Sequence, residues 1–350
     1  MAHIHIPERI PVRFLERSSA ATMVFGAMVV VGVVAFVLSL QRDVTAAWAS
    51  YVSNWLFFSS VAMGAVIFAV ATTIVKAKWN WSLRRISVAF AAFLPVAFVL
   101  MLPMLGLGEE YFPWIEKMAY DPIVQEKAAY LNLPFLITRS VVGVAILFGM
   151  GIYFAYLAVR PDMGLVDEAD LDAGRASWRA RLMSGWAGQE QEEVRSWQRM
   201  TKLAPALVLT YAAVMSFVVY DFAMSLDSHW FSTLFGGWYF MGAFWGGIAV
   251  TAFTAMVLRG KDAEVSRAVG IQQRHDIGKL AFAFTVFWTY LFFSQYIVIW
   301  YGKLPWEQSF MINRSGEAWG AYSLTVVILC FVVPFAGLIG RKAKMTPVLL

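Results

Sequence analysis

Residues 19–40 read SAATMVFGAMVVVGVVAFVLSL, and this stretch decides the fold class. It contains no charged side chain. A helix needs about 20 predominantly apolar residues to cross the hydrocarbon core of a bilayer, and a core strand of a soluble protein is far shorter. The stretch therefore predicts a membrane-spanning helix.

Seven further stretches along the chain repeat this pattern. The predicted spans cover residues 19–40, 48–75, 86–107, 133–158, 203–224, 234–258, 277–300 and 318–340. Their apolar runs are continuous rather than alternating, which argues against a transmembrane β-barrel. We therefore predict an all-α polytopic membrane protein, with one integral membrane domain over residues 1–350 and its eight helices in two bundles.

The composition agrees with this fold class. Hydrophobic residues make up 60% of the 350 residues and charged residues 15%, against about 45–50% and about 25% in soluble domains. A soluble chain of this length leaves roughly a quarter of its surface in water, so it could not hide this much apolar surface. The 15 tryptophans suit the aromatic belts of a membrane protein.

Lysine and arginine predict the orientation of the chain. Of the 28 basic residues, 21 lie in the N-terminal tail, the even-numbered loops and the C-terminal tail, and five lie in the odd-numbered loops. By the positive-inside rule the N-terminus is cytoplasmic. The loop over residues 159–201 is then cytoplasmic and the loop over 108–132 periplasmic. The net charge of +5 is thus an orientation signal and does not indicate nucleic-acid binding.

Both ends of the sequence carry predictions. Residues 1–18 lack the features of a cleavable secretory signal, so we expect the first span to be an uncleaved anchor. Basic residues at 341–344 and Pro347 precede another apolar run. We expect the natural chain to continue from there into at least one more span.

The counts of histidine and cysteine limit the redox chemistry of this chain. The four histidines are His3, His5, His229 and His275, and none of them forms a pair within a predicted span. A bis-histidine haem needs such a pair, and an iron–sulfur cluster needs more thiolates than Cys330 alone supplies. We therefore predict no metal and no redox cofactor on this chain, so electrons would travel through other subunits.

Polar side chains from separate helices are predicted to converge near the outer border of the membrane. Asp221 lies 16 residues beyond Pro205, which is roughly 24 Å from the inner border in a helix. The predicted cluster consists of Arg139, Asp221, Asp227, His229, Gln295 and Glu317. One interpretation is an interhelical ion pair between Arg139 and Asp221 or Asp227. The other is a quinone head-group pocket or a proton exit path.

Other polar residues carry weaker signals. Thr285 and Tyr290 lie deeper in the seventh span, where hydroxyls bond to helix carbonyls or line a water wire. The inner mouth of that span is marked by His275, Asp276 and Lys279. Gly242 and Gly246 form a G-x-x-x-G pattern, which favours close packing of helices.

Two blocks of sequence resemble a known family. Residues 221–240 read DFAMSLDSHWFSTLFGGWYF. Residues 275–284 read HDIGKLAFAF, and residues 293–305 read FSQYIVIWYGKLP. These blocks resemble ActF, a membrane subunit of bacterial alternative complex III that is similar to the NrfD/PsrC family of quinone-interacting membrane subunits.

The resemblance implies a place in a quinol-oxidising complex of the bacterial cytoplasmic membrane. Electrons would pass to cytochrome c or an oxidase through haems and iron–sulfur clusters in partner subunits. The implied partners are a sister NrfD-like subunit, an iron–sulfur protein, a multihaem cytochrome c and lipids. The first block contains Asp221, Asp227 and His229, and the second contains Gln295, Tyr301 and Lys303. Members of the family have about ten spans.

We therefore expect a cofactor-free subunit that scaffolds such a complex and conducts protons, and that is not catalytic alone. The first alternative is that this chain itself binds quinone or menaquinone. The second is a secondary transporter, a class that often carries broken helices and internal repeats. The sequence has no clear internal repeat, and its strongest polar groups gather at one border.

Overall fold

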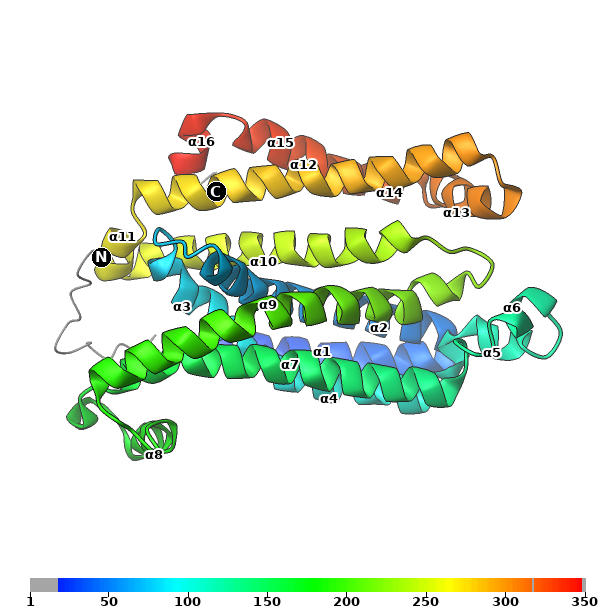
Figure 1. The fold of residues 1–350 in the computed structure, drawn as a ribbon. Coiled ribbons are helices and arrows are strands. Elements are labelled where there is room, and N and C mark those ends of the chain that lie inside the picture. Colours follow the sequence, from blue (N-terminus) through cyan, green and yellow to red (C-terminus); the bar gives the residue numbers. More distant parts are fainter. Residues whose placement is uncertain (1–17, 317, 348–350) are drawn as a thin grey trace.

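The computed structural model describes residues 18–316 and 318–347. Within these ranges all regular structure is helical, and eight segments are long and apolar enough to cross a membrane. The prediction of an all-α polytopic membrane protein is confirmed. The long helices run side by side along one direction (Figure 1). His3, His5 and Glu317 lie outside the described residues.

The bounds of the spanning segments follow the chain in order. They are α1 (Ser19–Arg42), α2 (Val44–Ile74), α3 (Trp81–Ala89) with α4 (Leu94–Leu107), α7 (Leu133–Met163), α9 (Gln189–Phe222), α10 (Thr233–Lys261), α12 (Ile271–Gly302), and α14 (Gly320–Val327) with α15 (Val333–Leu338). A 3-10 turn, η1 (Phe90–Phe93), joins α3 to α4. A π-helical turn, η5 (Ile328–Val332), joins α14 to α15.

Short helices lie at the two ends of the bundle. We call one end of the bundle the outer end. It carries η2 (Glu109–Tyr111), α5 (Pro113–Lys117), α6 (Pro122–Glu126), η4 (Met224–Leu226) and α13 (Pro305–Ser315). The opposite end is the inner end, and it carries η3 (Glu168–Asp170), α8 (Ala173–Leu182), α11 (Ala263–Ala268) and α16 (Arg341–Met345). In Figure 1 the outer end is on the right and the inner end on the left.

The fifth spanning helix is longer than its apolar stretch. The apolar run begins near residue 203, but α9 begins at Gln189 and continues without a break to Phe222. Its added turns are rich in Glu, Gln and Arg, which have high helix propensity but do not enter lipid. The predicted loop over 159–201 is therefore helical for much of its length.

Helices α2 and α10 form the centre of the bundle. A Cβ atom on Gly64 would overlap the carbonyl of Ala243, and one on Gly247 would overlap the backbone of Gly64. Only glycine permits this approach of two backbones. The predicted contact residues Gly242 and Gly246 instead meet side chains of α12 and α2, so Gly247 makes the closest approach.

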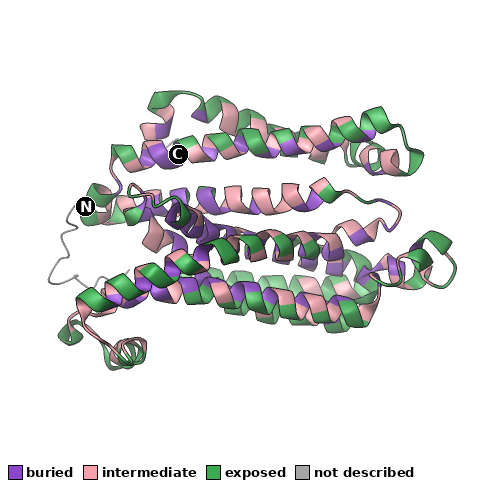
Figure 2. Ribbon diagram, viewed as in Figure 1, coloured by how far each residue is buried: buried purple, intermediate pink, exposed green. Residues whose placement is uncertain are grey.

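The hydrophobic core is divided into separate clusters. The largest is built from α2, α4, α7 and α9, and a second lies where α10 and α12 meet α3 and α15. The peripheral helix α1 has no buried residue (Figure 2). Its apolar surface suits contact with lipid, since it would be unfavourable in water.

Candidate functional site

The outer end of the bundle brings together most of the polar residues from the first block. The connection between α4 and α7, which includes η2, α5 and α6, lies beside the turn between α9 and α10. The Tyr111 hydroxyl donates a hydrogen bond of 2.6 Å to the carbonyl of Phe222, at the end of α9. This bond fixes the loop over the end of the helix that carries Asp221.

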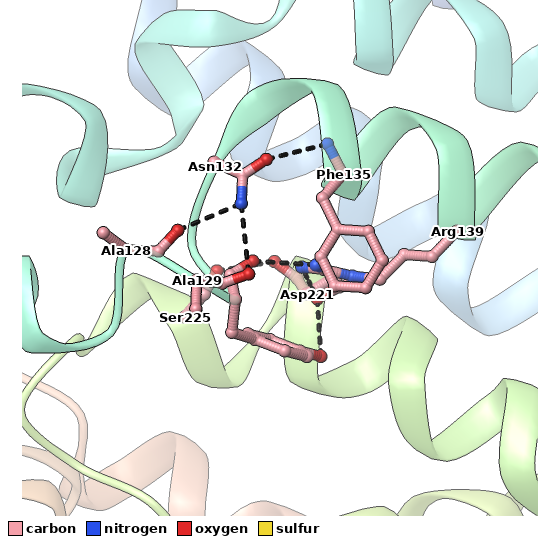
Figure 3. A network of polar contacts seen from close by, with 8 residues as sticks. Ala128, Ala129, Asn132, Phe135, Arg139, Asp221 and Ser225 are labelled. Atoms are coloured by element: carbon pink, nitrogen blue, oxygen red, sulfur yellow. Dashed lines mark hydrogen bonds and ion pairs between the residues drawn. The ribbon is translucent and has the colours of Figure 1, made fainter.

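Arg139 and Asp221 form a buried ion pair between α7 and α9 (Figure 3). The Arg139 Nη2 atom lies 2.6 Å from Asp221 Oδ1, and Nε lies 2.8 Å from Oδ2, so the pair is bidentate. The Asp221 side chain is 1% exposed and that of Arg139 is 10% exposed. Of the two carboxylates considered from the sequence, Asp221 is therefore the partner of Arg139.

The start of α7 positions Arg139. Asn132 caps this helix, since its side-chain oxygen accepts from the backbone N–H of Phe135 and its amide donates to the carbonyls of Ala128 and Ala129 (Figure 3). The guanidinium of Arg139 stacks over the rings of Tyr130 and Phe135, with its Cζ 3.9 and 4.6 Å from their centroids. These contacts hold the cation in a fixed orientation.

Tyr130 is the third member of this cluster. Its hydroxyl donates a 2.9 Å hydrogen bond to Asp221 Oδ1, and its carbonyl accepts from Arg139 Nη1 at 2.8 Å. Burial, and then the negative charge of Asp221, raises the pKa of Tyr130 above its usual value. The phenol therefore stays protonated and acts as a donor to the carboxylate.

A pocket of about 300 Å³ opens beside Tyr130 at the outer end. Its lining is mainly apolar and comes from the α6–α7 connection and the turn after α9. The polar groups on it include Tyr130, Lys127 and Asp227. Lys127 Nζ donates to the carbonyl of Ser228 at 2.5 Å, and burial lowers the pKa of Lys127, an effect that the charges of Asp227 and Asp121 oppose.

His229 pairs with a residue that the sequence did not single out. Its Nε2 atom lies 2.6 Å from Asp121 Oδ2, and the two side chains are 41% and 14% exposed. The hydrogen bond from His229 is the main cause that lowers the pKa of Asp121 below its usual value. Asp121 also caps α6 by accepting from the backbone N–H of Ile123 and Val124.

An aromatic stack links α13 to the same end of the bundle. The rings of Trp230 and Phe310 are parallel, with centroids 3.7 Å apart. Both belong to a buried cluster that includes Ile299 of α12. Gln295 is buried one turn before Ile299, but no hydrogen bond joins it to Asp221 in the described part of the chain. The structure thus places Gln295 near this end without adding it to the ion-pair cluster.

The other residues predicted within the seventh span or just after it lie apart from this cluster. Tyr301 is 72% exposed and Tyr290 is 60% exposed, so both side chains face out of this chain. Lys303 is exposed and ends α12 in a left-handed conformation with φ of 52°. Thr285 is buried and its hydroxyl donates to the carbonyl of Ala281 at 2.9 Å, which is the ordinary helix-backbone contact.

The inner-mouth residues form a local pair at the start of α12. Lys279 Nζ lies 2.7 Å from Asp276 Oδ1, and Gln272 donates to Asp276 Oδ2 at 2.8 Å. His275 is half-buried next to them. This group lies at the opposite end of α12 from Lys303, so it is separate from the outer cluster.

The sequence did not identify Tyr130, Lys127 and Asp121 as site residues. All three lie in a loop whose fold depends on its contacts with the turn after α9. The Asp121–Pro122 dipeptide was a local signal, because Asp before Pro is typical of a helix N-terminus. No comparable local signal marked Tyr130 or Lys127.

The arrangement has two chemical capacities. It joins α7 to α9 through a desolvated ion pair, and it connects a buried carboxylate through a tyrosine hydroxyl to a pocket at the surface. The chain matches no protein-family model and no curated protein sequence. Its function must therefore be argued from its residues.

Proposed function

We propose that this protein is a membrane subunit of a quinol-oxidising electron-transfer complex of the bacterial cytoplasmic membrane. In this role it scaffolds the partner subunits and carries protons to the outer surface. The resemblance of residues 221–240 and 275–305 to ActF-like subunits supports the assignment. Haems and iron–sulfur clusters would lie in the partner subunits.

One observation supports the proton-carrying role above the others. Tyr130 bonds to the buried Asp221 and also lines the outer pocket with Asp227. A pocket of about 300 Å³ has room for several waters. Hydroxyl groups and ordered waters relay protons because each both donates and accepts hydrogen bonds. The route would run from Asp221, which would pass its proton to the Tyr130 oxygen as the Tyr130 proton moves to a pocket water, and on to Asp227 and the His229–Asp121 pair.

The ion pair gives Asp221 a defined part in this proposal. Both carboxylate oxygens accept from Arg139, and Oδ1 also accepts from the Tyr130 hydroxyl. Asp221 therefore orients the O–H bond of Tyr130. His229 is paired with Asp121 and its side chain is 41% exposed, so it suits the exit of the route.

The experiment is a Tyr130→Phe substitution in the purified complex. This change removes the hydroxyl and keeps the ring under Arg139. We expect normal assembly with the multihaem cytochrome and the iron–sulfur protein, but a lower proton yield per quinol in proteoliposomes. Tyr120→Phe is the control, because Tyr120 lies in the same loop and is 64% exposed. Equal proton yields in the two variants would remove Tyr130 from the route.

The assignment to a complex is tested separately from the proton route. Affinity purification of this chain from its native membrane should bring down a multihaem cytochrome, an iron–sulfur protein and a sister membrane subunit. Purification of the chain alone, with solute transport activity in liposomes, would instead support a secondary transporter.

The outer pocket also favours a second candidate, which is binding of quinone by this chain. Its volume is at the lower end of the range for ligand pockets and its lining is mainly apolar. Lys127 donates one N–H to Ser228 and has further N–H groups for a quinone oxygen. A photoreactive quinone should then label residues 126–131 or 224–231. Labelling confined to the sister subunit would exclude this candidate.

A further inference from the structure

Two arginines lie at the inner end of the bundle, on the packed helices α10 and α12, far from the site described above. Arg259 lies in the last turn of α10 and Arg274 in the first turn of α12, with α11 between them in the chain. They lie close enough for each positive charge to act on the other. Two like charges side by side are unfavourable unless an anion lies between them.

Arg274 is almost fully buried, with 6% of its surface exposed. Its Nε atom donates to the carbonyl of Met345 in α16 at 2.9 Å. Its Nη1 atom is buried and has no hydrogen-bond partner. Burying a guanidinium nitrogen without a hydrogen-bond acceptor costs free energy. We therefore expect a further acceptor to bind at this position.

Arg259 also buries a guanidinium nitrogen that has no hydrogen-bond acceptor among the described residues. Its Nε atom is also buried without a partner. Across residues 18–316 and 318–347, neither Arg259 nor Arg274 forms an ion pair with a carboxylate. Two guanidinium groups thus lie on packed helices at one end of the bundle, each with a buried nitrogen that no described residue accepts from.

The nearby acidic side chains are engaged elsewhere. Asp276 accepts from Lys279 and Gln272. Asp262 caps α11 by accepting from the backbone N–H of Glu264 and Val265. Glu264 lies 4.0 Å from Arg267. Because no acidic side chain in residues 18–316 and 318–347 pairs with Arg259 or Arg274, an external anion is the simplest counter-charge for them.

The two arginines lie at the level of lipid head groups. Ala255 and Ile277, each about one turn further into the membrane segment, are fully buried in a hydrophobic cluster. The short helices α11 and α16 lie at this same end (Figure 1). Because the apolar part of α12 begins just after Arg274, the site lies at the border between hydrocarbon and water.

We propose that Arg259 and Arg274 bind a phosphate group between the inner ends of α10 and α12, supplied by the head group of an anionic phospholipid. Guanidinium groups bind phosphate oxygens through paired, charge-assisted hydrogen bonds. Basic pockets between membrane helices on the cytoplasmic side are known positions for such head groups. Free phosphate has the same chemistry and is the other source to distinguish.

The test uses the full chain in nanodiscs that contain phosphatidylcholine with a minor fraction of phosphatidylglycerol. Native mass spectrometry counts the phosphatidylglycerol that stays bound. Arg259→Gln is the informative variant, since Arg259 makes no hydrogen bond to a described residue that its loss could break. We expect Arg259→Gln to bind phosphatidylglycerol about tenfold more weakly, because each charged hydrogen bond contributes about one order of magnitude to the binding constant.

Arg267→Gln is the matched control, because Arg267 lies at the same end with 78% of its side chain exposed. A second measurement guards against misfolding. Added phosphatidylglycerol should raise the unfolding temperature of the wild type and the control but not that of Arg259→Gln.

A further arm separates the two sources of phosphate. Radiolabelled inorganic phosphate is added to protein in nanodiscs of phosphatidylcholine alone. Binding that depends on Arg259, without retention of phosphatidylglycerol, would keep the phosphate site and overturn its lipid source. The whole proposal is overturned if neither ligand binds, or if Arg267→Gln loses as much binding as Arg259→Gln.

Discussion

Arg139 and Arg160 stand 21 residues apart on α7, and each binds a carboxylate of α9. In a helix this separation is about 31 Å, close to the roughly 30 Å of hydrocarbon in a bilayer. Arg139 pairs with Asp221 at the outer end, and Arg160 pairs with Glu192 at the inner end, at 2.6 and 2.7 Å. The two helices are therefore joined by ion pairs near both ends of a segment about as long as the hydrocarbon core is thick.

Substitutions of Arg139 and Asp221 should have non-additive effects on the free energy of unfolding. Asp221→Leu leaves the buried charge of Arg139 without a carboxylate, and we expect about 3–5 kcal/mol of lost stability. The double variant with Arg139→Met should recover most of that loss, because it removes the unpaired charge. Chemical unfolding in detergent measures both. A double variant no more stable than Asp221→Leu would contradict this account.

The inner pair should control a different segment. Arg160 donates to the carbonyls of Leu182 and Ser184, and Glu192 accepts from the backbone N–H of Ala187. Glu192→Gln weakens this anchor, so trypsin should cut the loop at Arg179 and Arg181 several-fold faster. Asp221→Asn is the control, and it should leave the cleavage rate of the inner loop unchanged.

The stability of the loop around α6 should decrease at acidic pH. The pKa of Asp121 is lowered in the folded protein, so its contribution to stability is present above the usual aspartate pKa of about 3.9 and is lost as the pH falls through the lowered value. Hydrogen exchange of residues 121–130, corrected for the intrinsic rate, should accelerate below about pH 4. Asp121→Ala should show fast exchange at neutral pH as well.

A side chain introduced at Gly247 should disrupt the contact between α2 and α10. Gly247→Val places a branched side chain against the backbone of Gly64, so we expect loss of folded protein, measured by size-exclusion chromatography in detergent. Gly149→Ala is the control in α7, because no atom lies within 4 Å of its added Cβ. That change should be neutral or stabilise by up to about 1 kcal/mol. Normal folding of Gly247→Val would mean that the two backbones are not in contact.

The spanning helices were predictable because their signal is local. Each apolar run is long enough to cross the bilayer as a helix, independently of the helices beside it. The prediction underestimated α9, because the polar residues from Gln189 onward favour helix without favouring lipid. Hydropathy reports where a helix leaves the membrane and not where it ends.

The pairing of side chains was not predictable in the same way. Asp221 and Asp227 are six residues apart, and the sequence allowed either to meet Arg139. The choice depends on how α9 is rotated against α7 and on η4, which carries Asp227 past the end of the helix. Tyr130 and Asp121 entered the site only because the outer loop folds back over that turn.

The sequence by itself determined the class of protein, the number of apolar spans and the predicted orientation, because these follow from the composition of each segment and its flanking charges. The tertiary structure alone decided that Arg139 meets Asp221, that Tyr130 links this pair to a pocket, and that Arg259 and Arg274 each bury a nitrogen without an acceptor among the described residues. These relationships join residues that are distant in the chain. They are set by the rotation and packing of whole helices, which no local pattern encodes.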